Sequence, residues 1–219
     1  GLFLMVTFIA VMVVIFMPIT EDGNALDYLD NLYNSISKGS AYYIPKVEHM
    51  VEDHGSEVVT LNLKMADDET AAAVEPLFAK IGLTTSVEAN NLMVNGDLAA
   101  IFGACLDDAD AAYHNRGEKI EAKYGASSRA MLYGWWAALT AMEKDLKRQK
   151  LFKAADLTHT VQAKTVECAY NYYGIEAQNI KDRWAIVLFS LVFYVIYTVW
   201  YGYAIMFIFE GLGFELAAH

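Results

Sequence analysis

The two ends of the chain are continuous apolar runs, and the segment between them mixes apolar and polar residues. Residues 1–19 and 184–209 contain no charged side chain. About 20 apolar residues are needed to cross a hydrocarbon core that is about 30 Å thick. The pattern therefore predicts two transmembrane helices, over residues 1–19 and 184–211, which flank an extramembrane domain over residues 20–183.

The first apolar run has an alternative interpretation as a secretory signal peptide. Its apolar core is longer than the roughly 7–15 residues of a signal peptide, and Pro18-Ile19-Thr20 lacks a small-x-small cleavage site. We therefore expect a retained membrane helix. The sequence starts at Gly1 without a methionine, so we also expect that some N-terminal sequence precedes it.

Residues 25–36 carry the apolar stripe of an amphipathic helix. The stripe consists of Ala25, Leu29, Leu32, Tyr33 and Ile36. Asn24 is a suitable N-cap, so the helix is expected to begin just beyond the membrane. The stretch SKGSAYYIP is expected to be a loop, and residues 45–54 a short helix that Gly55 ends.

Apolar and polar residues alternate over residues 59–65, which is typical of a half-buried strand. The region beyond it predicts a helix, two short strands and a second helix. These are a helix capped by Asp67 or Asp68 and closed by Gly82, strands over residues 85–89 and 92–95 with a turn at Asn90 and Asn91, and a helix over residues 98–114 capped by Asp97. We expect the two Asn residues to supply the left-handed conformations of the turn. The connection from the first strand to the second is long enough for these two strands to pair in parallel. Residues 57–115 thus predict a β-α-β-β-α element with a three-stranded sheet.

Within residues 127–174, apolar residues recur every three or four positions in two segments, which predicts two helices that form an antiparallel hairpin. The two apolar stripes are Met131, Trp135, Leu139, Met142 and Leu146, and Leu157, Val161, Thr165, Cys168 and Tyr172. The whole chain therefore predicts an α+β membrane protein, in which two transmembrane helices flank a mostly helical domain with a small β-α-β-β-α element.

Charge is confined almost entirely to the middle of the chain. Residues 20–183 hold all 16 Lys and Arg residues and 25 of the 27 acidic residues, a formal charge of −9. Nucleic acids and anionic lipid surfaces attract clustered Lys and Arg, so neither is expected as a partner.

Two acidic segments offer His and Asp residues at helical spacing. His49 and Asp53 are four residues apart, and Asp110 and His114 are also four apart on the expected helix 98–114. An imidazole and a carboxylate on one helical turn are possible ligands of a divalent metal. The alternative is a solvated helix surface in an acidic protein, and we favour it. The sequence carries no hydrolase, nucleotide-binding or zinc-protease motif, so no catalytic residue and no cofactor are predicted.

The paired tryptophans and the two cysteines each leave two readings open. Trp135 and Trp136 point about 100° apart on a helix, so one is expected in the core and the other at an edge, where it could stack on a ligand. Cys105 and Cys168 either form a disulfide, if the domain lies in an oxidising compartment, or remain buried thiols that fill apolar space.

The last apolar run carries an unusual set of hydroxyl groups. Tyr194 and Tyr197 lie about 15–20 Å beyond Trp184 at 1.5 Å per residue, near the centre of a bilayer. A hydroxyl at that depth is costly unless it has a partner. The residues expected to pack against other transmembrane helices are Ser190, Tyr194, Tyr197, Thr198, Tyr201 and Gly202.

These features together predict a non-catalytic accessory subunit of a multi-subunit membrane complex, respiratory or transport-related. Its expected partners are other integral membrane subunits and the lipid bilayer. The alternatives are an extracytoplasmic sensor or ligand-binding module and, third, a metal-dependent enzyme. Because the first run resembles a signal anchor, we expect the bacterial inner membrane, with the middle domain on the extracytoplasmic side.

Overall fold

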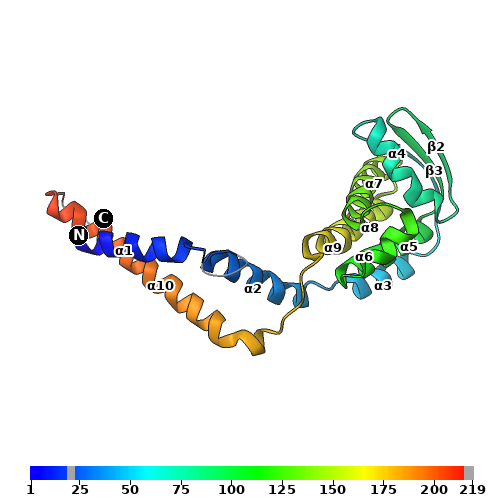
Figure 1. Cartoon of the computed structure of the whole chain (residues 1–219). Helices are drawn as coiled ribbons and strands as arrows, with labels where there is room; N and C mark the ends of the chain where they lie inside the picture. Colours follow the sequence, from blue (N-terminus) through cyan, green and yellow to red (C-terminus); the bar gives the residue numbers. More distant parts are fainter. Residues whose placement is uncertain (19–22, 215–219) are drawn as a thin grey trace. The chain divides into compact units, whose positions relative to one another are not determined.

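The computed structural model describes residues 1–18 and 23–214 (Figure 1). The described residues are mostly helical and contain one three-stranded antiparallel sheet. Contacts divide the chain into two compact units. One consists of residues 1–39 and 177–219, and the other of residues 40–176. We call them the helical unit and the mixed unit.

The described residues of the helical unit form three helices, α1 (Leu2–Phe16), α2 (Ala25–Ser40) and α10 (Ile180–Gly211). In Figure 1, α1 and α2 follow each other along α10. α10 has 32 residues and, by length and composition, is apolar enough to cross a membrane. At 1.5 Å per residue it is about 48 Å long.

The prediction of two flanking membrane spans is wrong for the first of them. α1 has only 15 residues, about 22 Å, and among the described residues α10 alone meets the length of a membrane span. The cause lies at Met17, whose extended backbone ends the helix. Met17 precedes Pro18, and the residue before a proline is disfavoured in the helical conformation.

Helix α2 confirms the predicted amphipathic helix and its cap. The side-chain oxygen of Asn24 accepts hydrogen bonds from the backbone N–H groups of Leu26 (2.8 Å) and Asp27 (3.1 Å). The helix extends to Ser40, four residues beyond the prediction. Part of the predicted loop is therefore helical.

The mixed unit contains a sheet with the strand order β1–β3–β2. The strands are β1 (Val58–Lys64), β2 (Thr84–Glu88) and β3 (Asn91–Asp97). Both outer strands pair antiparallel with β3. β3 lies between β1 and β2, so these two strands do not pair with each other and the expected parallel pairing is wrong.

The turn of that hairpin also differs from the prediction. The left-handed residue is Ala89, with φ of 51°, rather than either asparagine. Asn90 instead uses its side-chain amide to donate to the carbonyl of Met65, at 3.2 Å. The asparagine thus ties the turn to the end of β1.

Helices cover one face of the sheet. They include α4 (Asp68–Ala79), α5 (Leu98–Tyr113) and α7 (Ser128–Arg148), all of which contact strands. As predicted, Asp67 caps α4 and Asp97 caps α5 through their carboxylates. The core beneath the sheet is apolar. Its fully buried members include Leu61, Leu63, Phe78, Leu92, Phe102, Trp135 and Leu139.

The remaining helices are α3 (Ile44–His54), α6 (Gly117–Tyr124), α8 (Phe152–Val161), the π-helix η1 (Gln162–Val166) and α9 (Glu167–Tyr172). α3 ends at Gly55 with a positive φ, as predicted. α7 and the α8–η1–α9 segment lie within the residues of the predicted hairpin and contact each other. The prediction missed α6 and the π-helical turn.

Candidate functional site

Two of the tyrosines expected to bind other subunits lie against the chain's own first helix. The ring of Phe8 on α1 lies 6.4 Å from that of Tyr197 and 5.3 Å from that of Tyr201, between centroids. The indole N–H of Trp200 donates to the carbonyl of Leu4 at 3.1 Å. α1 thus contributes the ring of Phe8 and the backbone carbonyl of Leu4. The use of a backbone carbonyl as acceptor cannot be read from the apolar side chains of α1.

Ser190 also finds its partner within the helical unit. Its hydroxyl donates to the carbonyl of Val187 at 2.9 Å. The hydroxyl of Tyr33 on α2 lies 2.6 Å from Ser190 Oγ and is placed to donate to it. Sequence reasoning assigned Tyr33 only to an apolar stripe, because a contact between residues 157 positions apart leaves no local signal.

The other predicted packing residues form an exposed surface on α10, which we call the outer patch: Tyr194, Thr198 and Gly202. The side chain of Tyr194 is 58% exposed, and Thr198 donates to the backbone carbonyl of Tyr194 at 2.7 Å. A Cβ built on Gly202 meets no atom within 4 Å. Within the described residues, the space beside Gly202 is open, and Tyr194 lies at the edge of the patch, where its ring contacts that of Tyr197 at 5.5 Å.

An apolar groove of about 1,050 Å³ runs between α1, α2 and α10. Its lining is almost wholly apolar, apart from the hydroxyls of Tyr33, Ser190, Tyr194 and Tyr197. Such a surface is matched by hydrocarbon rather than by water. The groove therefore belongs to the same apolar surface as the membrane-span candidate.

The first metal candidate is an exposed helix surface. His49 lies 3.2 Å from Glu52, and both side chains are more than two-thirds exposed. Asp53 on the same helix is exposed too. Through residues 1–18 and 23–214, no group of three or more His, Cys, Asp or Glu residues is placed to hold a metal ion.

The second metal candidate, Asp110, is already occupied by protein donors. Its two oxygens accept from the Tyr42 hydroxyl and from the Arg116 guanidinium, each at 2.6 Å. His114 approaches the same carboxylate at 3.1 Å. Burial, together with the hydrogen bond to Asp110, raises the pKa of Tyr42 to about 12. The cluster joins the residues just before α3 to α5, and the oxygens of Asp110 that a metal ion would need already accept hydrogen bonds.

The neighbouring Asp108 is the buried carboxylate that sequence reasoning missed. It accepts hydrogen bonds from Lys123 (2.8 Å), Tyr124 (2.6 Å) and the indole of Trp135 (2.8 Å). These donors come from α6 and α7, so Asp108 joins three helices. A buried carboxylate is tolerated when its oxygens are paired in this way.

Both cysteines are free thiols in the structure, so the disulfide reading is not realised there. Cys105 is buried and Cys168 is partly buried. Burial raises the pKa of both thiols, for Cys105 well above its ordinary value. A thiol that stays protonated is a poor nucleophile, which fits the reading of both as apolar fillers.

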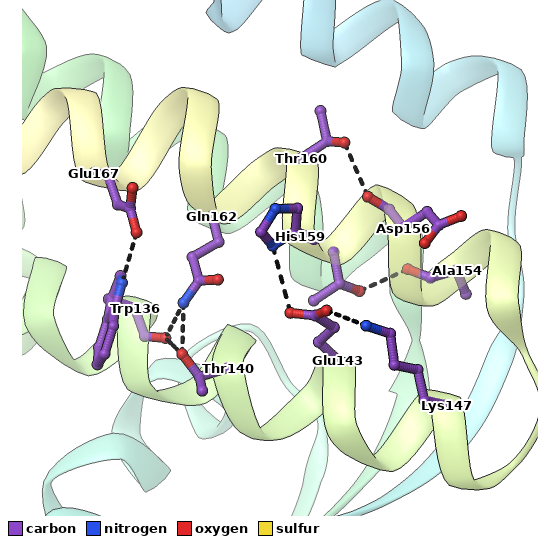
Figure 2. Close-up of polar contacts among 11 residues, drawn as sticks. Trp136, Thr140, Glu143, Lys147, Ala154, Asp156, His159, Thr160, Gln162 and Glu167 are labelled. Atoms are coloured by element: carbon purple, nitrogen blue, oxygen red, sulfur yellow. Dashed lines mark hydrogen bonds and ion pairs between the residues drawn. The ribbon is translucent and has the colours of Figure 1, made fainter.

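A polar seam joins α7 to the α8–η1–α9 segment (Figure 2). Glu143 accepts from Lys147 at 2.5 Å and lies 3.5 Å from His159. The side-chain amide of Gln162 donates to Thr140 Oγ1 at 2.5 Å and to the carbonyl of Trp136 at 3.0 Å. Gln162 is the first residue of the π-helical turn, so these two hydrogen bonds hold the start of the turn against α7.

The paired tryptophans divide as predicted. Trp135 is fully buried, where it packs edge-on against Phe78 at 5.8 Å. Trp136 is 37% exposed, and its indole N–H donates to Glu167 on α9 at 2.9 Å (Figure 2). Trp136 lies at a pocket of about 350 Å³ between α7 and α9. The lining is Leu132, Tyr133, Trp136, Val166, Glu167, Tyr170 and Asn171. We call it the aromatic pocket.

No protein-family model matches the chain, and no curated protein or solved structure matches it either.

Proposed function

We propose that the protein is a membrane-anchored, non-catalytic accessory subunit of a multi-subunit membrane complex. In this proposal α10 crosses the bilayer, and its outer patch binds a transmembrane helix of another subunit. The observation that carries the proposal is the outer patch itself, where an uncovered glycine and a small hydroxyl residue lie beside an exposed tyrosine.

The character of α10 supports a membrane position. A core helix of a soluble protein is mostly buried, whereas α10 buries only Ser190 and Ala204 of its 32 residues. A signal sequence lies near the N-terminus, whereas α10 begins at residue 180. Long apolar stretches of this kind are stable in hydrocarbon.

The chemistry of the outer patch supports a protein partner there. Small residues let two helix backbones approach closely, and hydroxyl groups bond across such contacts. Thr198 and Gly202 are four residues apart, so they lie on one side of α10. Tyr194 lies about 15 Å beyond Trp184, deep in the apolar slab, where its hydroxyl benefits from an acceptor on a neighbouring helix.

The proposal keeps the location expected from the sequence. The complex would lie in a bacterial inner membrane, and the mixed unit on its extracytoplasmic side. A respiratory or transport complex is the kind of assembly that we expect. The side of the membrane is tested by the access of a membrane-impermeant lysine reagent to the mixed unit in intact cells.

The proposal is tested by extracting the protein from its native membrane in a mild maltoside and measuring the mass of the intact particle. We expect other integral membrane subunits to co-purify in fixed ratio. A lone monomer, or a particle that contains only copies of this chain, would contradict the proposal.

A bulky residue at the outer patch sharpens this test. Gly202→Leu fills the space needed for close approach, so we expect about a tenfold loss of co-purifying subunits. Ile196→Phe is the control, because Ile196 is exposed and lies about 120° away around the helix. Equal retention of the partners in both variants would exclude the outer patch as the contact.

A further inference from the structure

The aromatic pocket in the mixed unit has walls from two helices. On α7, the rings of Tyr133 and Trp136 lie 5.9 Å apart between centroids with planes 21° apart, so they form one continuous aromatic surface. On α9, Tyr170 and Glu167 also line the pocket, next to Val166 of the π-helical turn. Tyr133, Trp136 and Tyr170 all remain exposed by more than a third. Three aromatic side chains are thus held at the surface around one concavity.

The π-helical turn shapes this pocket. A π-turn inserts one residue into a helix and is frequent at functional sites. Here it covers Gln162–Val166, immediately before the residues of α9 that line the pocket. The extra residue rotates α9 relative to α8, and Glu167 thereby reaches the indole of Trp136. The π-helical turn thus lies directly before the part of α9 that faces the aromatic side chains of α7.

The pocket is electrically suited to a positive ligand. The carboxylate of Glu167 accepts one hydrogen bond from Trp136, and no Lys or Arg of the described chain forms an ion pair with it. Aromatic ring faces carry negative potential and attract cations. The guanidinium of Arg129 already lies 5.6 Å from the ring centres of Tyr170 and Tyr173, so the rings of Tyr133 and Trp136 are the ones left for a ligand. The surrounding segment of residues 20–183 carries a formal charge of −9, which favours the approach of a cation.

We propose that the aromatic pocket binds a small organic cation with an apolar body, such as an alkylated ammonium compound. The volume of about 350 Å³ is at the small end of ligand sites. An anion would face the Glu167 carboxylate, and a bare metal ion would find one carboxylate where several ligands are needed. An alkylated ammonium group satisfies both the carboxylate and the ring faces. This proposal does not depend on a membrane partner.

The test compares two probes of the same shape and different charge. Choline carries a quaternary ammonium, and 3,3-dimethylbutan-1-ol replaces its nitrogen with carbon. Binding is followed on the full chain in maltoside, through the indole N–H resonance of Trp136, which the Trp136→Phe variant identifies. Phosphocholine detergents and lipids are left out because they carry the probe. We expect choline to shift this resonance and to bind about tenfold more tightly than the neutral compound.

Two variants assign the binding to the pocket. Glu167→Gln keeps an acceptor for Trp136 but removes the charge, so we expect about a fivefold or greater loss for choline alone. Tyr133→Leu removes an exposed wall, so the affinity should fall for both probes. The controls are Glu118→Gln and Phe152→Leu, which make the same kinds of change on exposed residues outside the lining.

The proposal is overturned by equal binding of the two probes, which would indicate a site for neutral apolar compounds. It is also overturned if choline leaves the Trp136 resonance unmoved at millimolar concentration, or if Glu167→Gln behaves as the Glu118→Gln control does. Circular dichroism of each variant confirms that the mixed unit is folded. Because the test uses isolated protein, its result is separate from the presence or absence of co-purifying subunits.

Discussion

The helical unit and the mixed unit satisfy their apolar and polar groups in opposite ways. α1 contains no buried residue, and α10 buries only Ser190 and Ala204. The mixed unit, in contrast, surrounds an extensive apolar core with helices on one face of a sheet. Water drives the collapse of the mixed unit. The helical unit leaves its apolar surface open, and such a surface needs hydrocarbon or another protein to cover it.

Polar contacts show the same difference. In the mixed unit, buried Asp108 and Asp145 each collect donors from several residues. Asp145 accepts from the backbone N–H of Asn62 and from the side chains of Arg148 and Gln149, so it ties α7 to the edge strand β1. In α10, Thr198 bonds to its own helix, as Thr7 does in α1. The two buried aspartates of the mixed unit thus bond to other elements, whereas these two threonines of the helical unit bond within their own helices.

The largest expected effect comes from removing the buried carboxylate of the mixed unit. Asp108→Ala leaves the ammonium of Lys123, the partly buried hydroxyl of Tyr124 and the buried indole of Trp135 without their acceptor. We expect a loss of about 3–5 kcal/mol in the free energy of unfolding. Denaturant titration with a fluorescence readout measures it. Asp107→Ala is the control, because that side chain is exposed and should cost less than about 0.5 kcal/mol. Similar losses for the two variants would refute the role given to Asp108.

The second prediction compares the effect on stability of replacing one leucine in each unit. Leu92 of β3 is fully buried, so Leu92→Ala should lower the free energy of unfolding of the mixed unit by about 2–5 kcal/mol. Leu188 of α10 is 52% exposed, so Leu188→Ala should change the thermal stability of the detergent-solubilised protein little. A large effect at Leu188 in the isolated chain would mean that α10 is packed in a core rather than open to lipid.

Local chemistry explains which parts of the fold were predictable. The caps at Asn24, Asp67 and Asp97 depend on a side chain and a backbone group two or three residues away, so the sequence shows them directly. The alternation of β1 and the stripe of α7 are equally local. The sheet order, in contrast, depends on which strands meet, and the left-handed turn residue is Ala89, next to the long-range contact between Asn90 and Met65.

The candidate sites follow the same rule. The split between Trp135 and Trp136 was predictable, because neighbours on a helix point about 100° apart. The aromatic pocket was not, because it requires the π-turn to bring Glu167 to Trp136. Likewise, the apolar run of α10 was evident, but the bond between Tyr33 and Ser190 was hidden. Contacts between residues far apart in the sequence can be identified only from the three-dimensional structure.

The smallest expected effect concerns acid and the seam between α7 and α8. The hydrogen bond from Lys147 holds the pKa of Glu143 below its ordinary value of 4.5, against the opposing effect of partial burial. The other charged neighbour is His159 on α8. A carboxyl whose pKa is lower in the folded state stabilises the fold above pH 4.5, and this contribution disappears as the pH falls through the folded pKa.

The native protein should therefore lose stability below pH 4.5 through this group, and Glu143→Gln should lose less over the same range. We expect a difference below about 1 kcal/mol, because the partners of Glu143 are half exposed or more. Unfolding by denaturant at pH 3 and at pH 6 gives the comparison. Glu118→Gln, which removes an exposed carboxylate on α6, should follow the native protein at both pH values. If the Glu143→Gln variant instead loses as much stability on acidification as the native protein, the seam holds the two helices by packing, and its ion pairs contribute nothing measurable.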